Sequence, residues 1–117
     1  GKQVRDVLHM RDLWQLVDYE IHHMDSVSGE TFNVGGGREN SVSLLELTEL
    51  CAVSTGHRIP IAASPETRST DVRIYVTDNG KVTKATGWAP STRLPEIIAD
   101  IGRWIGEHSR ELEEVLQ

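Results

Sequence analysis

Residues 1–9 have the sequence GKQVRDVLH, and residues 2–9 alternate imperfectly between polar and apolar side chains. This alternation predicts a β-strand with Val4 and Leu8 as contacts to a core. Residues 11–25 follow with apolar side chains at the spacing of a helix face. The apolar residues of that predicted helix are Leu13, Trp14, Val17, Ile21 and Met24. A strand followed directly by a helix is typical of a mixed α/β fold.

The next part of the chain predicts a second strand and a second helix. Phe32–Val34 has the composition of a short strand, and it runs into the three glycines Gly35–Gly37. Ser43 and Glu46 have the spacing of a capping box. The capping box predicts a helix that begins at this point and continues through about Thr55.

The second half of the chain continues the alternation of strands and helices. Residues 58–63 alternate around a proline and predict a short edge strand, and residues 72–76 are expected to be extended. Asp78 is expected to cap a short helix that ends at Gly87. The last helix is predicted from Leu94, where a proline follows in the first turn. This order of elements indicates a mixed α/β class.

The composition narrows the classes of partner. The 117 residues include 12 basic and 18 acidic side chains, and the net charge is −6. Nucleic acids and anionic membranes require clustered Lys and Arg, so neither is expected as a partner. No two histidines have metal-ligand spacing, and the single cysteine, Cys51, falls on the apolar side of its predicted helix and is expected in the core. A cytoplasmic protein is expected.

Two later stretches add a family resemblance. Residues 68–71 read RSTD, Tyr75 follows them, and residues 87–90 read GWAP. Together with residues 1–9 and 32–37, and in this order, they resemble the C-terminal third of an extended short-chain dehydrogenase/reductase. Within that superfamily the chain resembles the NAD-dependent epimerase/dehydratase enzymes of nucleotide sugars, in particular the CDP-paratose (CDP-tyvelose) 2-epimerase group.

The resemblance runs from Gly1 to about Trp104 and implies a particular α/β fold. That fold is the end of a Rossmann-type sheet joined to the small mixed α/β substrate-binding lobe of an extended short-chain dehydrogenase/reductase. Residues 1–35 would be the last strand–helix–strand elements that flank the Rossmann fold. Residues 36–117 would be the nucleotide-sugar-binding C-terminal lobe. The N-terminal Rossmann domain, which binds NAD in the parent enzyme, would be missing from this chain.

The chemistry of the family is expected to lie outside this chain. Gly35–Gly37 follows a predicted strand but lacks the later glycine of a dinucleotide fingerprint. Family catalysis uses a Tyr-x-x-x-Lys pair, whereas His23 and Asn79 stand four residues after Tyr19 and Tyr75. The chain alone is therefore expected to have no catalytic residue and no cofactor. Its parent would be an NAD-dependent isomerase.

Arg5 is the first predicted ligand of a nucleotide-diphosphate sugar. The resemblance places its guanidinium on the diphosphate, whose oxygens suit a bidentate fork. Without the resemblance, a surface ion pair between Arg5 and Asp6 or Asp12 is the favoured explanation.

The other predicted ligands follow from the same resemblance. Arg68 would bind the diphosphate, Asp71 the ribose hydroxyls, and Tyr75 and Arg38 would lie near the nucleotide. Thr70 stands where the family has a glycine in the motif R-x-G-D. An ordinary turn with a solvent-facing arginine also explains the RSTD stretch, and core packing explains Tyr75 equally well.

Two functions remain open from the sequence. The first is the substrate-binding segment of a nucleotide-sugar epimerase or dehydratase, in particular a CDP-sugar 2-epimerase. The alternative is a stand-alone, non-catalytic interaction or nucleotide-binding module, or a decayed gene fragment. If the chain is severed from a parent, its exposed helix face and the edge of the Phe32–Val34 strand are expected to make it self-associate.

Overall fold

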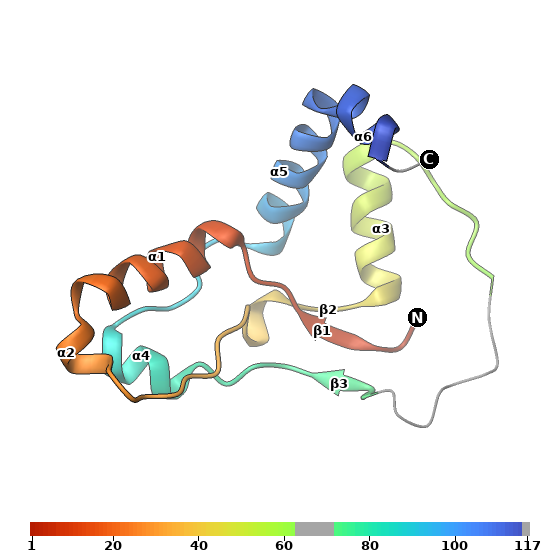
Figure 1. Ribbon diagram of the computed structural model, residues 1–117. Coiled ribbons are helices and arrows are strands. Elements are labelled where there is room, and N and C mark those ends of the chain that lie inside the picture. The colour runs from red at the N-terminus through yellow and green to blue at the C-terminus, as the bar shows by residue number, and fades with distance from the viewer. Residues whose placement is uncertain (63–71, 116–117) are drawn as a thin grey trace.

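A three-stranded mixed sheet lies at the centre of the fold. The computed structural model describes residues 1–62 and 72–115. The sheet has the order β2-β1-β3, with β1 (Val4–Asp6) between an antiparallel β2 (Ser41–Ser43) and a parallel β3 (Ile74–Tyr75) (Figure 1). The predicted first strand is therefore confirmed but short, and it is the middle strand of the sheet.

The first helical region is two helices rather than one. They are α1 (Met10–His22) and α2 (Met24–Val27), so the helix predicted over residues 11–25 breaks at His23. The apolar stripe predicted on this helix is mostly exposed, which is the arrangement expected above for a chain severed from a parent. The buried residues of α1 are Asp12 and Leu16. Most of the predicted apolar stripe is exposed, namely Trp14, Val17, Ile21 and Met24.

A small core explains which face of α1 is buried. Leu16 packs with Val82 of α4 (Gly80–Thr86) and with Trp88. Partly buried apolar side chains lie against this cluster, namely Leu8, Phe32 and Val34. The strand predicted at residues 32–34 is wrong, because among the described residues this segment pairs with no strand, and Phe32 and Val34 pack their side chains against the core.

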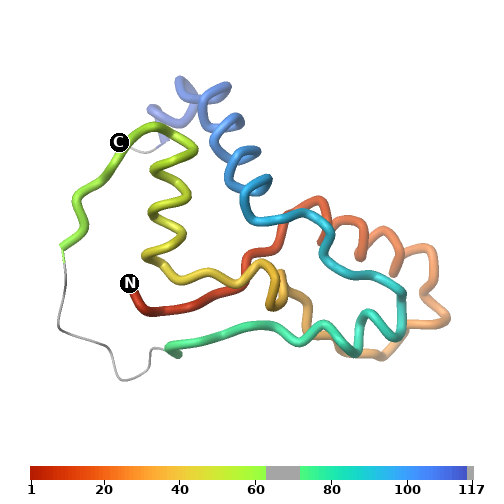
Figure 2. Tube along the Cα trace, turned by 180° about the vertical axis from the view of Figure 1, so that it is seen from behind, coloured from red at the N-terminus to blue at the C-terminus, as the bar shows by residue number. Residues whose placement is uncertain are grey.

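Beyond the sheet, two helices pack against each other. Figures 1 and 2 both show α3 (Leu44–Thr55) beside α5 (Leu94–Glu107), followed by the short α6 (Ser109–Val115). The buried apolar side chains in this part are Val42, Ala52, Leu94 and Ile97. Over the described residues, no helix has the length and apolar character needed to cross a membrane.

The predicted capping box at the start of α3 is present. The Glu46 backbone N–H donates to the Ser43 hydroxyl at 3.2 Å, and the Ser43 backbone N–H donates to Glu46 Oε2 at 2.9 Å. Gly56 ends the helix in the left-handed conformation, with φ of 72°. Cys51 is exposed, so its predicted place in the core is wrong.

Two other local predictions need correction. Residues 58–62 form no strand; instead, the Arg58 guanidinium binds both carboxylate oxygens of Glu49 on α3, at 2.9 and 2.5 Å. The N-cap position of α4 is Asn79 rather than Asp78. Asp78 Oδ1 still accepts a hydrogen bond from the Gly80 N–H at 2.8 Å. The predicted end of this helix at a left-handed Gly87 is confirmed.

Candidate functional site

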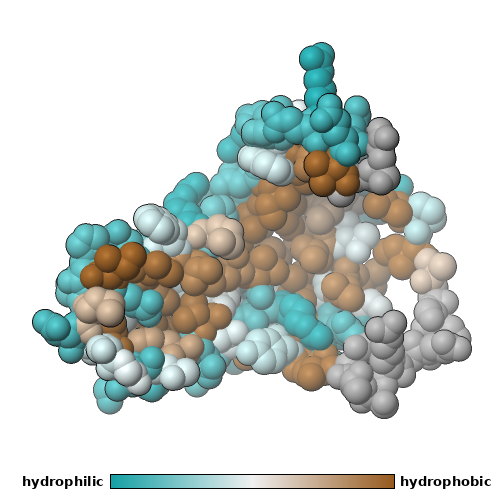
Figure 3. All heavy atoms as spheres, in the orientation of Figure 1, coloured by the Kyte–Doolittle hydropathy of each residue, from teal (hydrophilic) through white to brown (hydrophobic). Residues whose placement is uncertain are grey.

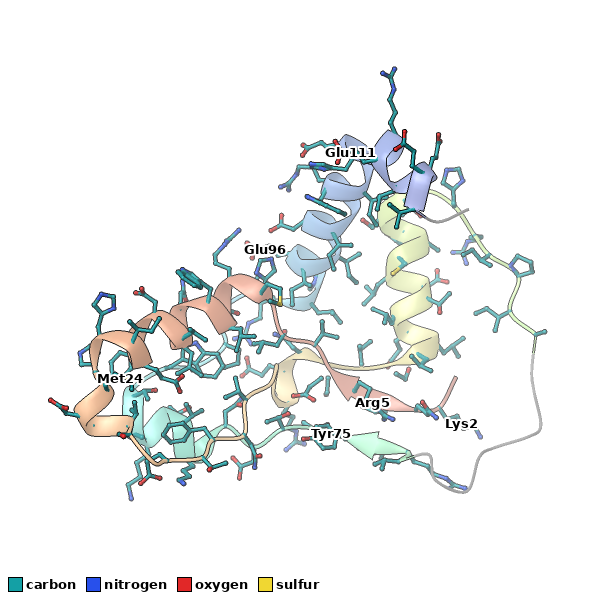
Figure 4. The ribbon with its side chains drawn as sticks, viewed as in Figure 1. Lys2, Arg5, Met24, Tyr75, Glu96 and Glu111 are labelled. Atoms are coloured by element: carbon teal, nitrogen blue, oxygen red, sulfur yellow. The ribbon has the colours of Figure 1, made fainter. Side chains whose placement is uncertain are left out.

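Arg5 and Tyr75 lie side by side at the centre of the sheet. The register pairs Arg5 of β1 with Val42 on one side and with Tyr75 of β3 on the other. Residues directly opposite each other on neighbouring strands project from the same face of a sheet. Arg5 is half-buried and Tyr75 is 54% exposed, and both are labelled on their adjacent strands in Figure 4. The sheet therefore brings together two of the predicted substrate ligands.

The polar groups of the predicted ligands have few partners within the chain. Arg5 Nη1 donates to the Val4 carbonyl oxygen at 2.7 Å. Within residues 1–62 and 72–115, Arg5 forms no ion pair, and the Tyr75 hydroxyl and Arg38 guanidinium form no hydrogen bond or ion pair. The ion pair of Arg5 with an acidic neighbour, considered above, is thus not formed.

Arg38 is held at the sheet by a buried asparagine two residues later. It begins the one-turn 3₁₀ helix η1 (Arg38–Asn40), which leads into β2. Asn40 is 1% exposed; its Nδ2 donates to the Thr92 carbonyl oxygen at 2.8 Å, and its Oδ1 accepts from the Leu94 N–H at 3.2 Å. Arg38 itself is exposed. Asn40 thus connects η1 to the residues that begin α5.

The three glycines pack closely against other parts of the chain. A Cβ on Gly36 would overlap the carbonyl group of Val7, which follows β1. Gly37 has φ of 70°, which favours glycine. Two hydrogen bonds join Gly35 to Asn79. The Gly35 N–H donates to Asn79 Oδ1 at 3.1 Å, and Asn79 Nδ2 donates to the Gly35 carbonyl oxygen at 2.9 Å. This arrangement does not fit a dinucleotide cradle, because the close approach is already made by the chain itself.

Asp6 joins three segments of the site, and sequence reasoning missed it. Its Oδ2 accepts hydrogen bonds from the N–H of Gly37 at 2.9 Å and from the N–H of Thr77 at 3.1 Å. The Thr77 hydroxyl also donates to this carboxylate. Partial burial raises the pKa of Asp6, but these hydrogen bonds outweigh it and hold the pKa below its ordinary value. The signal in the sequence that could have indicated Asp6 was an acidic residue within a predicted strand.

Asp12 is buried and does not form the surface ion pair with Arg5 that was considered as the alternative. It is fully buried, and its two oxygens accept four hydrogen bonds of 2.8–3.0 Å from the N–H and hydroxyl groups of Ser91 and Thr92. Burial raises the pKa of Asp12, but these donors lower it by a larger amount, so the pKa lies below the ordinary value. The Trp88 Nε1–H donates to the Asp12 carbonyl oxygen at 2.8 Å. Trp88 is itself buried, with 8% of its surface exposed.

Arg68 and Asp71 lie outside the described residues. The described chain resumes at Val72, directly after Asp71 in sequence and two residues before β3. Among the described residues, no group of three His, Cys, Asp or Glu side chains is placed to hold a metal ion. A hollow of about 400 Å³ lies beside α3, but none of the predicted ligands lines it.

Sequence comparison finds relatives among nucleotide-sugar epimerases. No protein-family model matches the chain. CDP-paratose 2-epimerase of Salmonella typhi is 35% identical over 104 residues, which are 89% of this chain and 30% of that enzyme. UDP-glucose 4-epimerase of Halalkalibacterium halodurans is 32% identical over 111 residues, 92% of this chain and 32% of that enzyme. The chain thus spans about a third of the length of the curated relatives it matches.

The fold gives the same relationship. A crystal structure of UDP-glucose-4-epimerase from Stenotrophomonas maltophila, with bound NAD and formylated UDP-arabinopyranose, matches 95% of this chain and 32% of its own, with a TM-score of 0.80 and 26% identity. The chain therefore has the fold of part of an extended short-chain dehydrogenase/reductase, which confirms the predicted class. More narrowly, it is homologous to a segment of the NAD-dependent epimerase/dehydratase enzymes that include CDP-paratose 2-epimerase and UDP-glucose 4-epimerase.

Proposed function

We propose that this chain is the nucleotide-sugar-binding segment of an NAD-dependent epimerase or dehydratase, with a CDP-sugar 2-epimerase as the specific assignment. The observation behind the proposal is the pairing of β1 with β3, which sets Arg5 beside Tyr75. Arg38 lies in η1, directly before β2 of the same sheet, and Arg68 and Asp71 precede β3 in sequence. The preference for a CDP-sugar follows the relative from Salmonella typhi.

The proposed ligands would bind the part of the substrate that does not react. Arg5 and Arg68 suit a diphosphate, because guanidinium groups donate in a planar fork to phosphate oxygens. Asp71 would accept hydrogen bonds from ribose hydroxyls, and Tyr75 would pack near the nucleotide. Anchoring the nucleotide places the sugar for chemistry carried out elsewhere in the enzyme. NAD, bound by the rest of the parent enzyme, would supply the hydride acceptor.

The surface of the chain supports a larger parent protein. Its accessible surface is 9191 Å², whereas a compact protein of 13.1 kDa exposes about 6,400 Å². The radius of gyration is 17.2 Å, against about 13 Å for a compact domain of this length. These values favour a segment that packs against further structure over a stand-alone module. On this basis residues 1–35 and 36–117 keep their proposed assignment to Rossmann-flanking elements and substrate lobe.

The parent protein can be tested before any enzymology. An immunoblot of source cells with an antibody against this chain is expected to show a band two to three times the size of the chain, roughly the size of a two-lobed protein. A band at 13.1 kDa would contradict the proposed parent and favour the stand-alone alternative.

The proposed ligands can be tested in the full-length enzyme with CDP-sugar and UDP-sugar substrates. Arg5→Ala and Arg68→Ala are each expected to raise KM by about tenfold to a hundredfold with a smaller effect on kcat, because a hydrogen bond to a charged group contributes about 1.5–3 kcal/mol. Arg103→Ala is the control, since Arg103 is an exposed helix residue paired with Asp100 at 3.1 Å. An unchanged KM for both ligand variants would overturn the assignment.

A further inference from the structure

The structure shows one carboxylate in contact with two segments that come together only in the folded chain. Asp6 lies on β1, Gly37 is 31 residues away and Thr77 is 71 residues away. Both backbone N–H groups donate to the same oxygen of Asp6. A single side chain therefore fixes the distance between the glycine loop, the central strand and the segment that follows β3.

Each of these three segments also contains one of the proposed substrate ligands. Arg5 directly precedes Asp6, Arg38 directly follows Gly37, and Tyr75 is two residues before Thr77. Neighbouring Cα atoms are only about 3.8 Å apart, so a shift at a contact of Asp6 moves the adjacent ligand by a similar amount. Asp6 is thus one residue from Arg5, and its partners Gly37 and Thr77 are one residue from Arg38 and two residues from Tyr75.

We propose that Asp6 is a positioning residue for nucleotide-sugar binding, which holds Arg5, Arg38 and Tyr75 in one arrangement through its bonds to Gly37 and Thr77. The inference rests on the proposed function, because it assigns a role in the same site. Asp6 itself touches no substrate. Its effect on binding is carried by the three segments that it joins.

The chemistry of the Asp6 contacts suits a permanent rigid connection. An ionised carboxylate only accepts hydrogen bonds, and all three groups that face Asp6 are donors. Hydrogen bonds to a charged acceptor are stronger than those between neutral groups. The neighbouring glycine adds to the fit, because a Cβ on Gly35 would overlap both Thr77 and the Asp6 carboxylate. The loop can therefore approach Asp6 closely only with glycine at this position.

The Asp6 contacts differ from a general stabilising role in a way that can be measured. Asp12 provides the comparison, because its buried carboxylate also accepts backbone and hydroxyl hydrogen bonds. Those bonds connect α1 to Ser91 and Thr92, and they reach the proposed ligands only indirectly, through the contact of Thr92 with Asn40 near Arg38. Loss of Asp12 should destabilise the fold without a specific effect on substrate affinity, whereas loss of Asp6 should weaken binding.

The test uses the full-length enzyme and measures KM, kcat and the melting temperature together. Asp6→Ala is expected to raise KM for the nucleotide sugar by about tenfold or more, with a smaller change in kcat, because displaced positioning groups weaken anchoring. Asp6→Asn, which keeps an acceptor oxygen, and Thr77→Val, which removes only the hydroxyl donor, should raise KM less. Asp12→Asn should lower the melting temperature and leave KM within about twofold of the parent value.

The outcomes separate this inference from the proposed function. If Arg5→Ala raises KM while Asp6→Ala and Thr77→Val leave it within about twofold, the positioning role is wrong and the binding site stands. The role is also wrong if Asp12→Asn raises KM as much as Asp6→Ala does. If Asp6→Ala does not fold, the Thr77→Val result decides in the same way. An unchanged KM in all variants, Arg5→Ala included, overturns both proposals.

Discussion

At the scale of single residues, buried carboxylates hold distant segments of this chain together. Asp12 on α1 is fully buried, and four donors from Ser91 and Thr92 surround its two oxygens. The indole of Trp88 donates to the Asp12 backbone. These contacts attach residues 88–92 to α1 across a separation of about 80 residues, and they set the direction in which the chain enters α5.

Asp12→Asn is predicted to lower the free energy of unfolding by about 2 kcal/mol at neutral pH, since an amide cannot accept from all four donors and places its own N–H groups against some of them. Urea unfolding of the full-length protein measures the change. Asp18→Asn is the control, because Asp18 is an exposed carboxylate on the same helix and should cause no measurable change. Equal stability of the two variants would contradict the structural role of Asp12.

The pH dependence follows from the sign of the pKa shift. Folding lowers the pKa of Asp12 below its ordinary value of 3.8, so the folded state favours the ionised form. The stabilisation is fully present above the unfolded pKa and is lost as the pH falls through the folded pKa. The difference in stability between the parent and Asp12→Asn should therefore be constant above about pH 5 and shrink below about pH 4. A constant difference down to pH 2 would contradict the shift.

At the scale of elements, local sequence signals determine where the helices begin and end. The capping box of Ser43 and Glu46 begins α3, and left-handed glycines at positions 56 and 87 end α3 and α4. The N-terminus of α3 also lies directly after β2, so Ser43 closes the strand and begins the helix. The start of α3 is also held by the Leu44 N–H, which donates to the Gln3 carbonyl oxygen at 3.0 Å, and by the Leu45 N–H, which donates to the Gly1 carbonyl oxygen at 3.2 Å.

Ser43→Ala is predicted to destabilise the protein by about 1 kcal/mol, because it removes the hydroxyl that accepts the Glu46 N–H. Thermal unfolding of the full-length enzyme is the measurement. Ser54→Ala is the matched control in the same helix, because Ser54 is exposed and alanine is a better helix former. The cap has no energetic role if both variants melt at the temperature of the parent.

At the scale of the whole molecule, two apolar surfaces remain uncovered. Figure 3 shows apolar side chains over α1 and α2 and again between α3 and α5. The exposed apolar side chains of the first surface are Met10, Trp14, Val17, Ile21 and Met24. The accessible surface of the whole chain exceeds that of a compact protein of this mass by about 2,800 Å², an area in the range of permanent interfaces. Under the proposed function, the outer face of α1 is expected to pack against the rest of the parent protein.

The isolated chain is predicted to self-associate through this α1 face, because exposed apolar patches of this size drive association. Sedimentation velocity should show a weight-average mass that rises with concentration. A double variant, Val17→Glu and Ile21→Glu, should shift the chain toward monomer. Gln15→Glu adds charge elsewhere on the same helix and should not. A parent chain that stays monomeric at high concentration would contradict the assignment of this face.

The sequence predicted the local features of the fold and much less of its long-range pairing. The capping box of α3, the end of α4 at Gly87 and the extended residues at β3 were predicted correctly, because each depends on residues close in sequence. The strand at residues 32–34 and the core position of Cys51 were predicted wrongly. Apolar spacing shows that a face will be covered, but it does not show which partner covers it.

The sequence by itself determined the mixed α/β class, the resemblance to extended short-chain dehydrogenases/reductases and the residue types that suit a nucleotide diphosphate. Only the tertiary structure decided that Arg5 pairs with Tyr75 and that Asp6 joins the glycine loop to Thr77. The physical reason is the range of the interactions. A cap or a turn is fixed by groups within four residues, whereas a buried carboxylate takes its donors from whichever segments the fold brings to it.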